Sequence, residues 1–281
     1  GHTGIDDRIA AFVLDNLDHS LLDHAVLLAL DAIYDVNGKL LKDQTVYHVN
    51  NEFVAQITSR NKKAFFGASI HPYRRDAIRE LERLARLGAC LVKWLPSAQL
   101  IDLSHTKCLG FYDALCALDI PLLCHTGTEH VIPGGETHMN EPALLRFPLE
   151  RGVTVIAAHC GARLFITETD YFQQWSQLAL EYPDLYGDIS AFGFPLRRRA
   201  LQKILRNPVL VDRVLFGSDF PSPTMPSSFL GQIKLAQIRR LSRLSNPFDK
   251  AVSTMMSAGV PALCFSRPYS ILHLDRVLST P

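Results

Sequence analysis

The sequence repeats one pattern, a short apolar run that closes on a polar residue and is followed by a loop and a stretch with helical periodicity. The repeats follow one another at roughly 30 residues, which is enough for a strand, a helix and two loops. Runs of this kind, apolar almost throughout, are typical of strands buried on both faces of a parallel sheet. The runs are Ala25–Asp31, Ala64–His71, Ala89–Leu95, Ile120–His125, Val153–His159, Leu185–Ser190 and Arg213–Asp219.

The stretches between the runs predict amphipathic helices. Arg75–Leu87 places Ala77, Leu81 and Leu84 on one face, with arginine and glutamate opposite, and Gly88 follows as a helix-ending glycine. Tyr171–Tyr182 and Leu196–Leu205 have a similar pattern, and the segment from Ala251 to Ser266 predicts one last helix.

Strands alternating with helices predict an α/β protein with a parallel sheet covered by helices. Seven strands are visible, and an eighth would close a (β/α)8 TIM barrel, a fold that about 250 residues can build. The alternative is an open doubly wound sheet, but no glycine-rich phosphate loop follows any strand. Because no linker or low-complexity tract divides the chain, we expect one domain over residues 1–281.

Charge and cysteine usage limit the functional classes. A formal net charge of +1, with no basic stripe, argues against nucleic acid as a partner. No apolar stretch is long enough for a membrane span, and no signal peptide opens the chain. The six cysteines lie in apolar surroundings without a CxxC motif, so we expect reduced thiols and a cytoplasmic protein. A small-molecule substrate is expected, and a homo-oligomer stays open.

The residues that close the runs carry the chemistry. The closing ends of parallel barrel strands meet around one mouth, where the active sites of such barrels lie. Histidine and aspartate converging there form a suitable environment for zinc, manganese or iron. Any one such histidine has an ordinary alternative, because strand-end histidines are often hydrogen-bonded core residues. The closing residues are Asp31, His71, Lys93, His125, His159, Ser190 and Asp219.

Three of these ends have informative local sequences: His125 stands in LLCHTG, His159 in IAAHCG and Asp219 in LFGSDFP. In this order and at these distances they resemble the amidohydrolase superfamily, more narrowly its amidohydrolase 2 group of barrel hydrolases and decarboxylases. The resemblance extends from about Asp23 to Leu263. It includes the segments IHP at 70–72, VKWLP at 92–96 and DIS at 188–190. HTG or HCG alone is a weak signal, whereas the ordered set is strong.

The resemblance implies a role for each of the three residues. His125 would bind a divalent metal, with Zn²⁺ expected first and Mn²⁺ or Fe²⁺ as alternatives. His159 would be a second ligand in two-metal relatives, or would polarise substrate or orient water in one-metal relatives. Asp219 would bind metal and take a proton from the water. A bound metal lowers the pKa of water towards neutrality.

The beginning of the chain departs from the family pattern. The family's first strand ends in an HxH pair of metal ligands, and no complete HxH occurs here. Ala25–Asp31 corresponds to the family's second strand, so we expect the first strand to precede Gly1. On that interpretation His2 is the second histidine of the pair and a metal ligand; on the alternative, the metal site is absent.

Substrate contacts are expected from Lys93, His71 and Arg163. Lys93 would be carboxylated and bridge two metals, pair with a substrate carboxylate or phosphate, or simply lie beside Trp94. His71 would line the mouth or be structural, and Arg163 would bind an anion or be an ordinary helix-start arginine.

Two further groups of residues are weaker candidates. The loop residues Glu129, His130 and Glu136 would contact substrate or be solvated. The charge run Arg197–Arg199 is interpreted as a solvated helix face.

Three functions follow from these residues. The first is hydrolysis of an amide, ester or lactone of a small molecule by metal-activated water, with Asp219 and His159 as catalytic residues. The second is metal-dependent, non-oxidative decarboxylation of a small carboxylic acid. The third is a metal-free barrel that serves as a binding module, for which the incomplete HxH is the main argument.

Overall fold

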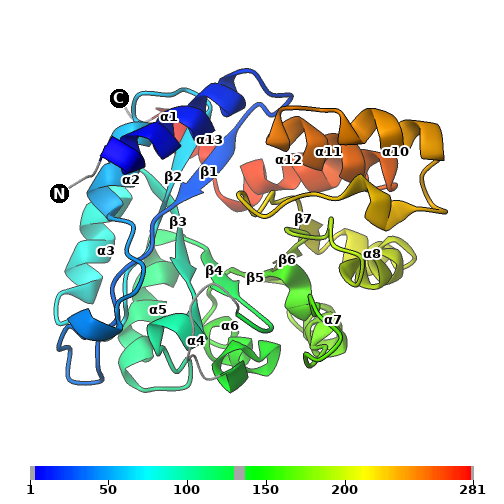
Figure 1. Ribbon diagram of the computed structural model, residues 1–281. Helices are drawn as coiled ribbons and strands as arrows, with labels where there is room; N and C mark the ends of the chain where they lie inside the picture. The colour runs from blue at the N-terminus through cyan, green and yellow to red at the C-terminus, as the bar shows by residue number, and fades with distance from the viewer. Residues whose placement is uncertain (1–3, 130–136, 280–281) are drawn as a thin grey trace.

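The computed structural model describes residues 4–129 and 137–279 and contains one parallel sheet. Its seven strands pair in chain order, each with the next one along the sequence. Figure 1 shows the strands following an arc, with the helices on its outer side. The strands are β1 Ala25–Leu28, β2 Ala64–Ala68, β3 Ala89–Trp94, β4 Leu122–His125, β5 Val155–Ala158, β6 Leu185–Asp188 and β7 Val214–Leu215.

Helices connect the strands and cover the sheet. The α-helices of eight or more residues are α1 Gly4–Asp18, α2 Asn51–Thr58, α3 Ala77–Arg86, α5 Lys107–Leu118, α7 Phe172–Glu181, α8 Arg197–Leu205, α10 Leu235–Ser242, α11 Pro247–Ser257 and α12 Ala262–Ile271. The shorter ones are α4 Pro96–Gln99, α6 Arg146–Leu149, α9 Pro208–Val211 and α13 Leu274–Ser279. Single 3₁₀ turns are η1 Lys42–Gln44, η2 Thr137–Asn140, η3 Pro142–Leu145, η4 His159–Gly161 and η5 Pro226–Phe229.

Local sequence explains where several of these helices begin and end. Asn50 and Asn246 cap α2 and α11, each accepting two backbone N–H groups of the first turn through its side-chain oxygen. Gly88 follows α3 with φ of 90°, as expected of a helix-ending glycine. The predicted helices at 75–87, 171–182 and 196–205 are confirmed as α3, α7 and α8.

The prediction of one last helix from Ala251 was wrong, because the chain breaks there into α11 and α12. The break is at Gly259–Pro261, where Gly259 has φ of 91° and Pro261 precedes α12. Proline cannot donate the backbone hydrogen bond that a continuous helix would need.

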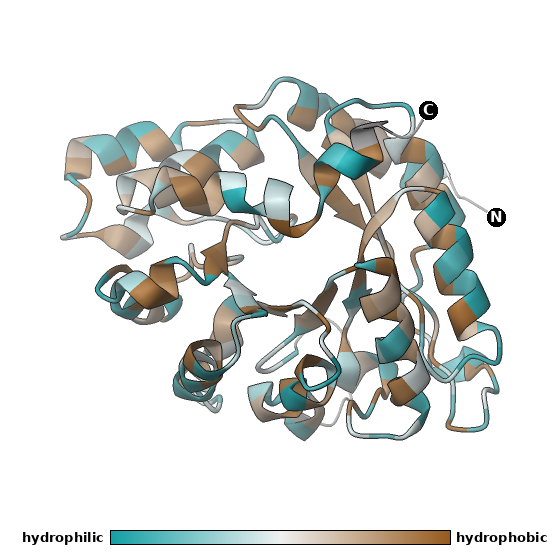
Figure 2. Ribbon diagram, turned by 180° about the vertical axis from the view of Figure 1, so that it is seen from behind, coloured by the Kyte–Doolittle hydropathy of each residue, from teal (hydrophilic) through white to brown (hydrophobic). Residues whose placement is uncertain are grey.

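Strand side chains alternate between two apolar layers. Phe66, Val92 and Trp94 belong to the layer between the sheet and its helices. Phe65, Leu91 and Ile156 belong to a second layer on the concave side of the sheet. The apolar strands run through the middle of the molecule in Figure 2, whereas the helices carry hydrophilic stripes. Every second side chain of a strand points to the same face. The side chains two residues after those of the concave layer therefore also point into the barrel, at the ends where the strands finish.

The sheet is open between β7 and β1. No strand of the described part of the chain pairs with the outer edge of either one. Helices α1 and α11 pack together, with Leu17 and Phe248 in one buried cluster. Asp249 accepts the Leu21 N–H at 2.7 Å, which ties the end of α1 to α11. The structure thus confirms an α/β TIM-barrel architecture that lacks one strand.

Within the described residues, no helix combines the length and the apolar character that crossing a membrane requires. All six cysteines are free thiols.

Candidate active site

The closing ends of the central strands bring together Lys93 from β3, His125 from β4, His159 after β5 and Asp188 from β6. Lys93 pairs in register with Leu123, and His125 with Ala158. All four residues are buried. The rings of His125 and His159 meet edge to face with centroids 5.0 Å apart. The sequence prediction that these two histidines lie together at the barrel mouth is confirmed.

His159 is held in one orientation by the segment that follows β6. Its backbone N–H donates to Asp188 Oδ1 at 2.9 Å. Its ring Nδ1 lies 3.1 Å from the Ser190 carbonyl oxygen and 2.8 Å from Ser190 Oγ. Because a carbonyl oxygen only accepts, Nδ1 carries the proton and Nε2 keeps its lone pair. Burial lowers the pKa of His159 well below its usual range, so the ring is neutral.

Backbone conformation places these groups. His159 and Cys160 have φ of 63° and 51°, values in the left-handed region that non-glycine residues rarely adopt. Thr126 stabilises this turn, since its hydroxyl donates to Ala158 O at 2.6 Å and accepts from Gly161 N–H at 2.9 Å. Asp219 has φ of 56°. Strained backbone of this kind is typical of functional sites.

His125 is held from the loop that follows β4. Its Nδ1 lies 3.5 Å from Glu129 Oε2, and its Nε2 lies 3.4 Å from the Thr128 carbonyl oxygen. Burial lowers the pKa of His125 to about 4, although the Glu129 carboxylate acts in the opposite direction. His125 is therefore neutral at pH 7, which is the form in which an imidazole binds a metal ion.

Asp219 lies just beyond β7 and retains an exposed surface. Ser222 Oγ donates to its Oδ2 at 2.8 Å. Partial loss of water around the carboxylate raises the pKa of Asp219, and the Asp188 charge adds to this. Lys93, Arg197 and the Ser222 hydrogen bond oppose the rise. A carboxylate with a raised pKa is a better proton acceptor than an ordinary surface aspartate.

Arg197 corrects the interpretation of Arg197–Arg199 as a solvated face. Its side chain is buried, and its Nε and Nη1 donate to the carbonyl oxygens of Ala162 and Ser190 at 3.0 and 3.3 Å. Arg199 is exposed and Arg198 half-buried. The charge run could not reveal this, because the first residue of α8 turns inward towards the mouth whereas the next two do not.

Asp31 and His71 form a separate cluster. His71 is fully buried, with Nε2 at 2.8 Å from Gln99 O and Nδ1 accepting the Tyr73 N–H at 3.2 Å. Asp31 accepts the His71 N–H at 2.8 Å and pairs with Arg74 at 3.1 Å. Both His71 nitrogens are occupied by protein atoms, so we assign it a structural role in place of the substrate contact expected.

The remaining predicted site residues are less informative. Arg163 is half-buried, and its Nη1 donates to Ile166 O at 3.4 Å within its own loop. Among the described residues, no hydrogen bond or ion pair joins it to the mouth. His2, His130 and Glu136 lie outside the described residues.

A protein-bound divalent metal needs several donor atoms close together. The expected ligands His125, His159 and Asp219 all belong to the mouth. However, no three histidine, cysteine or acidic side chains gather closely enough to hold an ion within residues 4–129 and 137–279. The described residues alone therefore do not complete a metal site, and at least one further donor would be needed.

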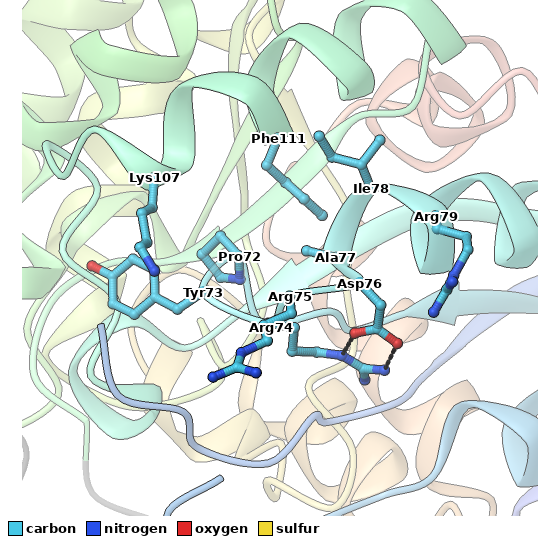
Figure 3. A pocket seen from close by; sticks show the side chains of 10 residues that line it. All are labelled: Pro72, Tyr73, Arg74, Arg75, Asp76, Ala77, Ile78, Arg79, Lys107 and Phe111. Atoms are coloured by element: carbon cyan, nitrogen blue, oxygen red, sulfur yellow. Dashed lines mark hydrogen bonds and ion pairs between the residues drawn. The ribbon is translucent and has the colours of Figure 1, made fainter. Parts of the chain in front are cut away.

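A surface hollow of about 430 Å³ lies away from the mouth, beside the beginnings of α3 and α5 (Figure 3). Arg74 bonds to Asp76 in its wall, and Lys107 extends beside Tyr73. The hollow contains none of the strand-end histidines or acids. We therefore place the candidate site at the barrel mouth.

A family sequence profile described as "Amidohydrolase" matches residues 1–252. No curated protein sequence matches the chain.

Solved structures share the fold at low identity. A proposed 2-pyrone-4,6-dicarboxylic acid hydrolase from Pseudomonas putida has a TM-score of 0.61 at 15% identity, over 94% of this chain and 87% of the other. An uncharacterised TIM-barrel protein from Bordetella bronchiseptica has 0.61 at 17% identity, over 89% and 83%. The IDCase of Metarhizium anisopliae has 0.57 at 12% identity, over 98% and 80%.

Proposed function

The chain belongs to the amidohydrolase family, whose members are hydrolases or decarboxylases, and on that premise we propose that its barrel mouth hydrolyses an amide, ester or lactone of a small molecule. Asp219 and His159 are the proposed catalytic residues, and Lys93 is a proposed substrate contact. The observation that carries the proposal is the fixed tautomer of His159 in a barrel mouth that also contains Asp219, a carboxylate of raised pKa.

The two groups have complementary roles. His159 directs its protonated Nδ1 to Ser190, so Nε2 is left as an acceptor that orients a water molecule. Asp219 takes a proton from that water as it attacks the substrate carbonyl carbon. The carbonyl oxygen gains negative charge in this step, which a bound divalent ion would offset. The protonated Asp219 then returns its proton to the departing amine or alcohol.

A divalent metal, zinc first, is part of the proposal. His125 and Asp219 would hold it, with a further ligand such as His2. When bound, it would supply a water of lowered pKa and polarise the substrate carbonyl. We expect the purified full-length protein to contain about one bound divalent ion per chain by elemental analysis.

The test is a panel of carboxylated lactones, esters and amides incubated in H₂¹⁸O. Hydrolysis places one ¹⁸O atom in each product acid, which mass spectrometry detects. Release of CO₂ from a carboxylic acid substrate without ¹⁸O in the organic product would support decarboxylation instead. If zinc-loaded protein binds the same compounds but catalyses neither reaction, the result would contradict the proposal and support a binding module.

A further inference from the structure

Two cations in the barrel mouth are buried without an acidic partner. Lys93 is 8% exposed and Arg197 is 5% exposed. Neither has a carboxylate oxygen within 4.0 Å among the described residues, although several other arginines do. Burying an unpaired charge is costly, so such groups are normally paired or reserved for a ligand.

Lys93 is directed into the barrel. It follows Leu91 by two residues along β3, and Leu91 belongs to the apolar layer on the concave side of the sheet. Its ammonium group donates to no described atom. In the described region, the fully buried side-chain nitrogen and oxygen atoms without a hydrogen-bond partner are His24 Nδ1, Arg213 Nε and Thr254 Oγ1. Lys93 Nζ has no partner and is not one of them, so it keeps some exposed surface. The Lys93 ammonium therefore reaches open space.

Arg197 is fixed from the other side of the mouth. Its Nε donates to Ala162 O and its Nη1 to Ser190 O, which anchors the guanidinium between the segments that follow β5 and β6. Its Nη2 has no acceptor among the described residues and, like Lys93 Nζ, keeps some exposed surface. A planar guanidinium held at two of its nitrogens presents the third in a fixed direction.

Both cations face the same space. Each acts electrostatically on His125, His159 and Asp219. Asp188 Oδ1 accepts the backbone N–H groups of His159 and Ser190, and Asp219 Oδ2 accepts from Ser222. The two glutamates nearby also have other partners, since Glu129 lies against His125 and Glu168 accepts the Leu164 N–H. No carboxylate among the described residues forms an ion pair with Lys93 or Arg197.

We infer that Lys93 and Arg197 together bind a carboxylate group of the substrate, with Lys93 Nζ donating to one oxygen and Arg197 Nη2 to the other. This assignment rests on the proposed function, and it names the substrate class as a small carboxylic acid derivative. The carboxylate would fix the reacting carbonyl beside Asp219 and His159.

The charges around the site favour a carboxylate over a phosphate. Asp219 and Asp188 act electrostatically on Arg197, so the site already contains negative charge. A doubly charged phosphate monoester would be repelled more strongly there than a singly charged carboxylate. Charge-assisted hydrogen bonds of this kind are stronger than those between neutral groups.

The test measures binding by calorimetry, with isophthalate as the carboxylate probe and isophthalamide as its neutral counterpart. We expect full-length protein to bind isophthalate at least tenfold more tightly than isophthalamide. Lys93→Met and Arg197→Lys should each weaken isophthalate binding about tenfold or more and leave isophthalamide binding within twofold. The matched controls Lys107→Met and Arg199→Lys, both at exposed positions, should change neither.

Several results would overturn the inference. These are equal affinity for the two probes, unchanged isophthalate binding by Lys93→Met, or tighter binding of phenyl phosphate than of benzoate. If Arg197→Lys does not fold, Lys93→Met decides alone, because the Lys93 ammonium has no structural partner. The binding measurement does not depend on turnover. If the probes bind as expected but no substrate is hydrolysed in H₂¹⁸O, the carboxylate site is upheld and the proposed reaction is contradicted.

Discussion

Ser190 contacts His159 Nδ1 twice, through its hydroxyl oxygen at 2.8 Å and its carbonyl oxygen at 3.1 Å. The same hydroxyl donates to Asp188 Oδ1. The imidazole is thus oriented by a buried residue of the segment that follows β6. Supporting contacts of this kind commonly tune catalytic histidines.

Ser190→Ala tests this support. The carbonyl contact remains, so the tautomer of His159 should be kept, but its orientation loosens. We expect kcat to fall about tenfold, within the usual range for a supporting residue, with KM nearly unchanged. Steady-state kinetics provide the measurement. The control is Ser176→Ala, at a half-buried position of α7 where the hydroxyl donates to Gln173 O. An unchanged kcat would show that Ser190 does not position His159.

His71 predicts a pH-dependent stability. Burial lowers its pKa from 6.5 to about 4, while it remains neutral in the folded protein. Between pH 6.5 and 4 the unfolded chain binds a proton that the folded chain does not, so stability rises with pH in this window. The full difference is about 3 kcal/mol.

Urea unfolding at pH 7.5 and pH 4.5 measures this effect. His71→Gln should lose about 2–3 kcal/mol less stability than the wild-type chain between these two values. It should keep the pH dependence that the buried His125 and His159 contribute in the same direction. His48→Gln, at an exposed position, should behave as the wild-type chain does. The same loss in wild type and His71→Gln would contradict the assignment.

Much of the fold could be predicted because its signal is local. Runs such as Val153–His159 are apolar almost throughout, and this alone identifies a strand buried on both faces. The ends of the strands were less predictable. The strand β7 covers two residues of the expected run Arg213–Asp219, and β1 ends at Leu28, before Asp31. Hydrogen bonding to a neighbouring strand decides these limits, and the sequence does not display it.

The candidate site was predictable to the extent that it depends on strand ends. His125 and His159 close their runs and do meet in the mouth. Arg197 was missed, because its burial depends on how the segment after β6 folds back over Ala162. His71 closes a run in the same way as His125, yet a local hydrogen-bond network with Gln99 and Tyr73 occupies it. Only the packed structure separates the two cases.

Gly187 tests the packing beneath the mouth. A Cβ atom there would lie 2.5 Å from Cys160 Sγ and 2.6 Å from Trp175 Cζ2, and Trp175 is fully buried. Gly187→Ala should therefore destabilise the protein by about 1–3 kcal/mol. Thermal and urea unfolding provide the measurement.

Gly110 is the matched control for Gly187. It lies within α5, and a Cβ there would meet Ile78 Cδ1 at an ordinary 3.6 Å. Gly110→Ala should stabilise the chain by about 0.5–1 kcal/mol, because alanine favours the helix. Equal effects of the two substitutions would contradict the described packing.

The most direct test of the proposed active site is the turnover of Asp219→Asn, measured on the substrate identified in H₂¹⁸O. Asparagine keeps the shape of the side chain but cannot take the proton from water. We expect kcat/KM to fall about 100-fold or more, with unfolding by urea nearly unchanged. Asp113→Asn, in the exposed pair with Arg151, should retain full activity. Wild-type turnover by Asp219→Asn would contradict the account.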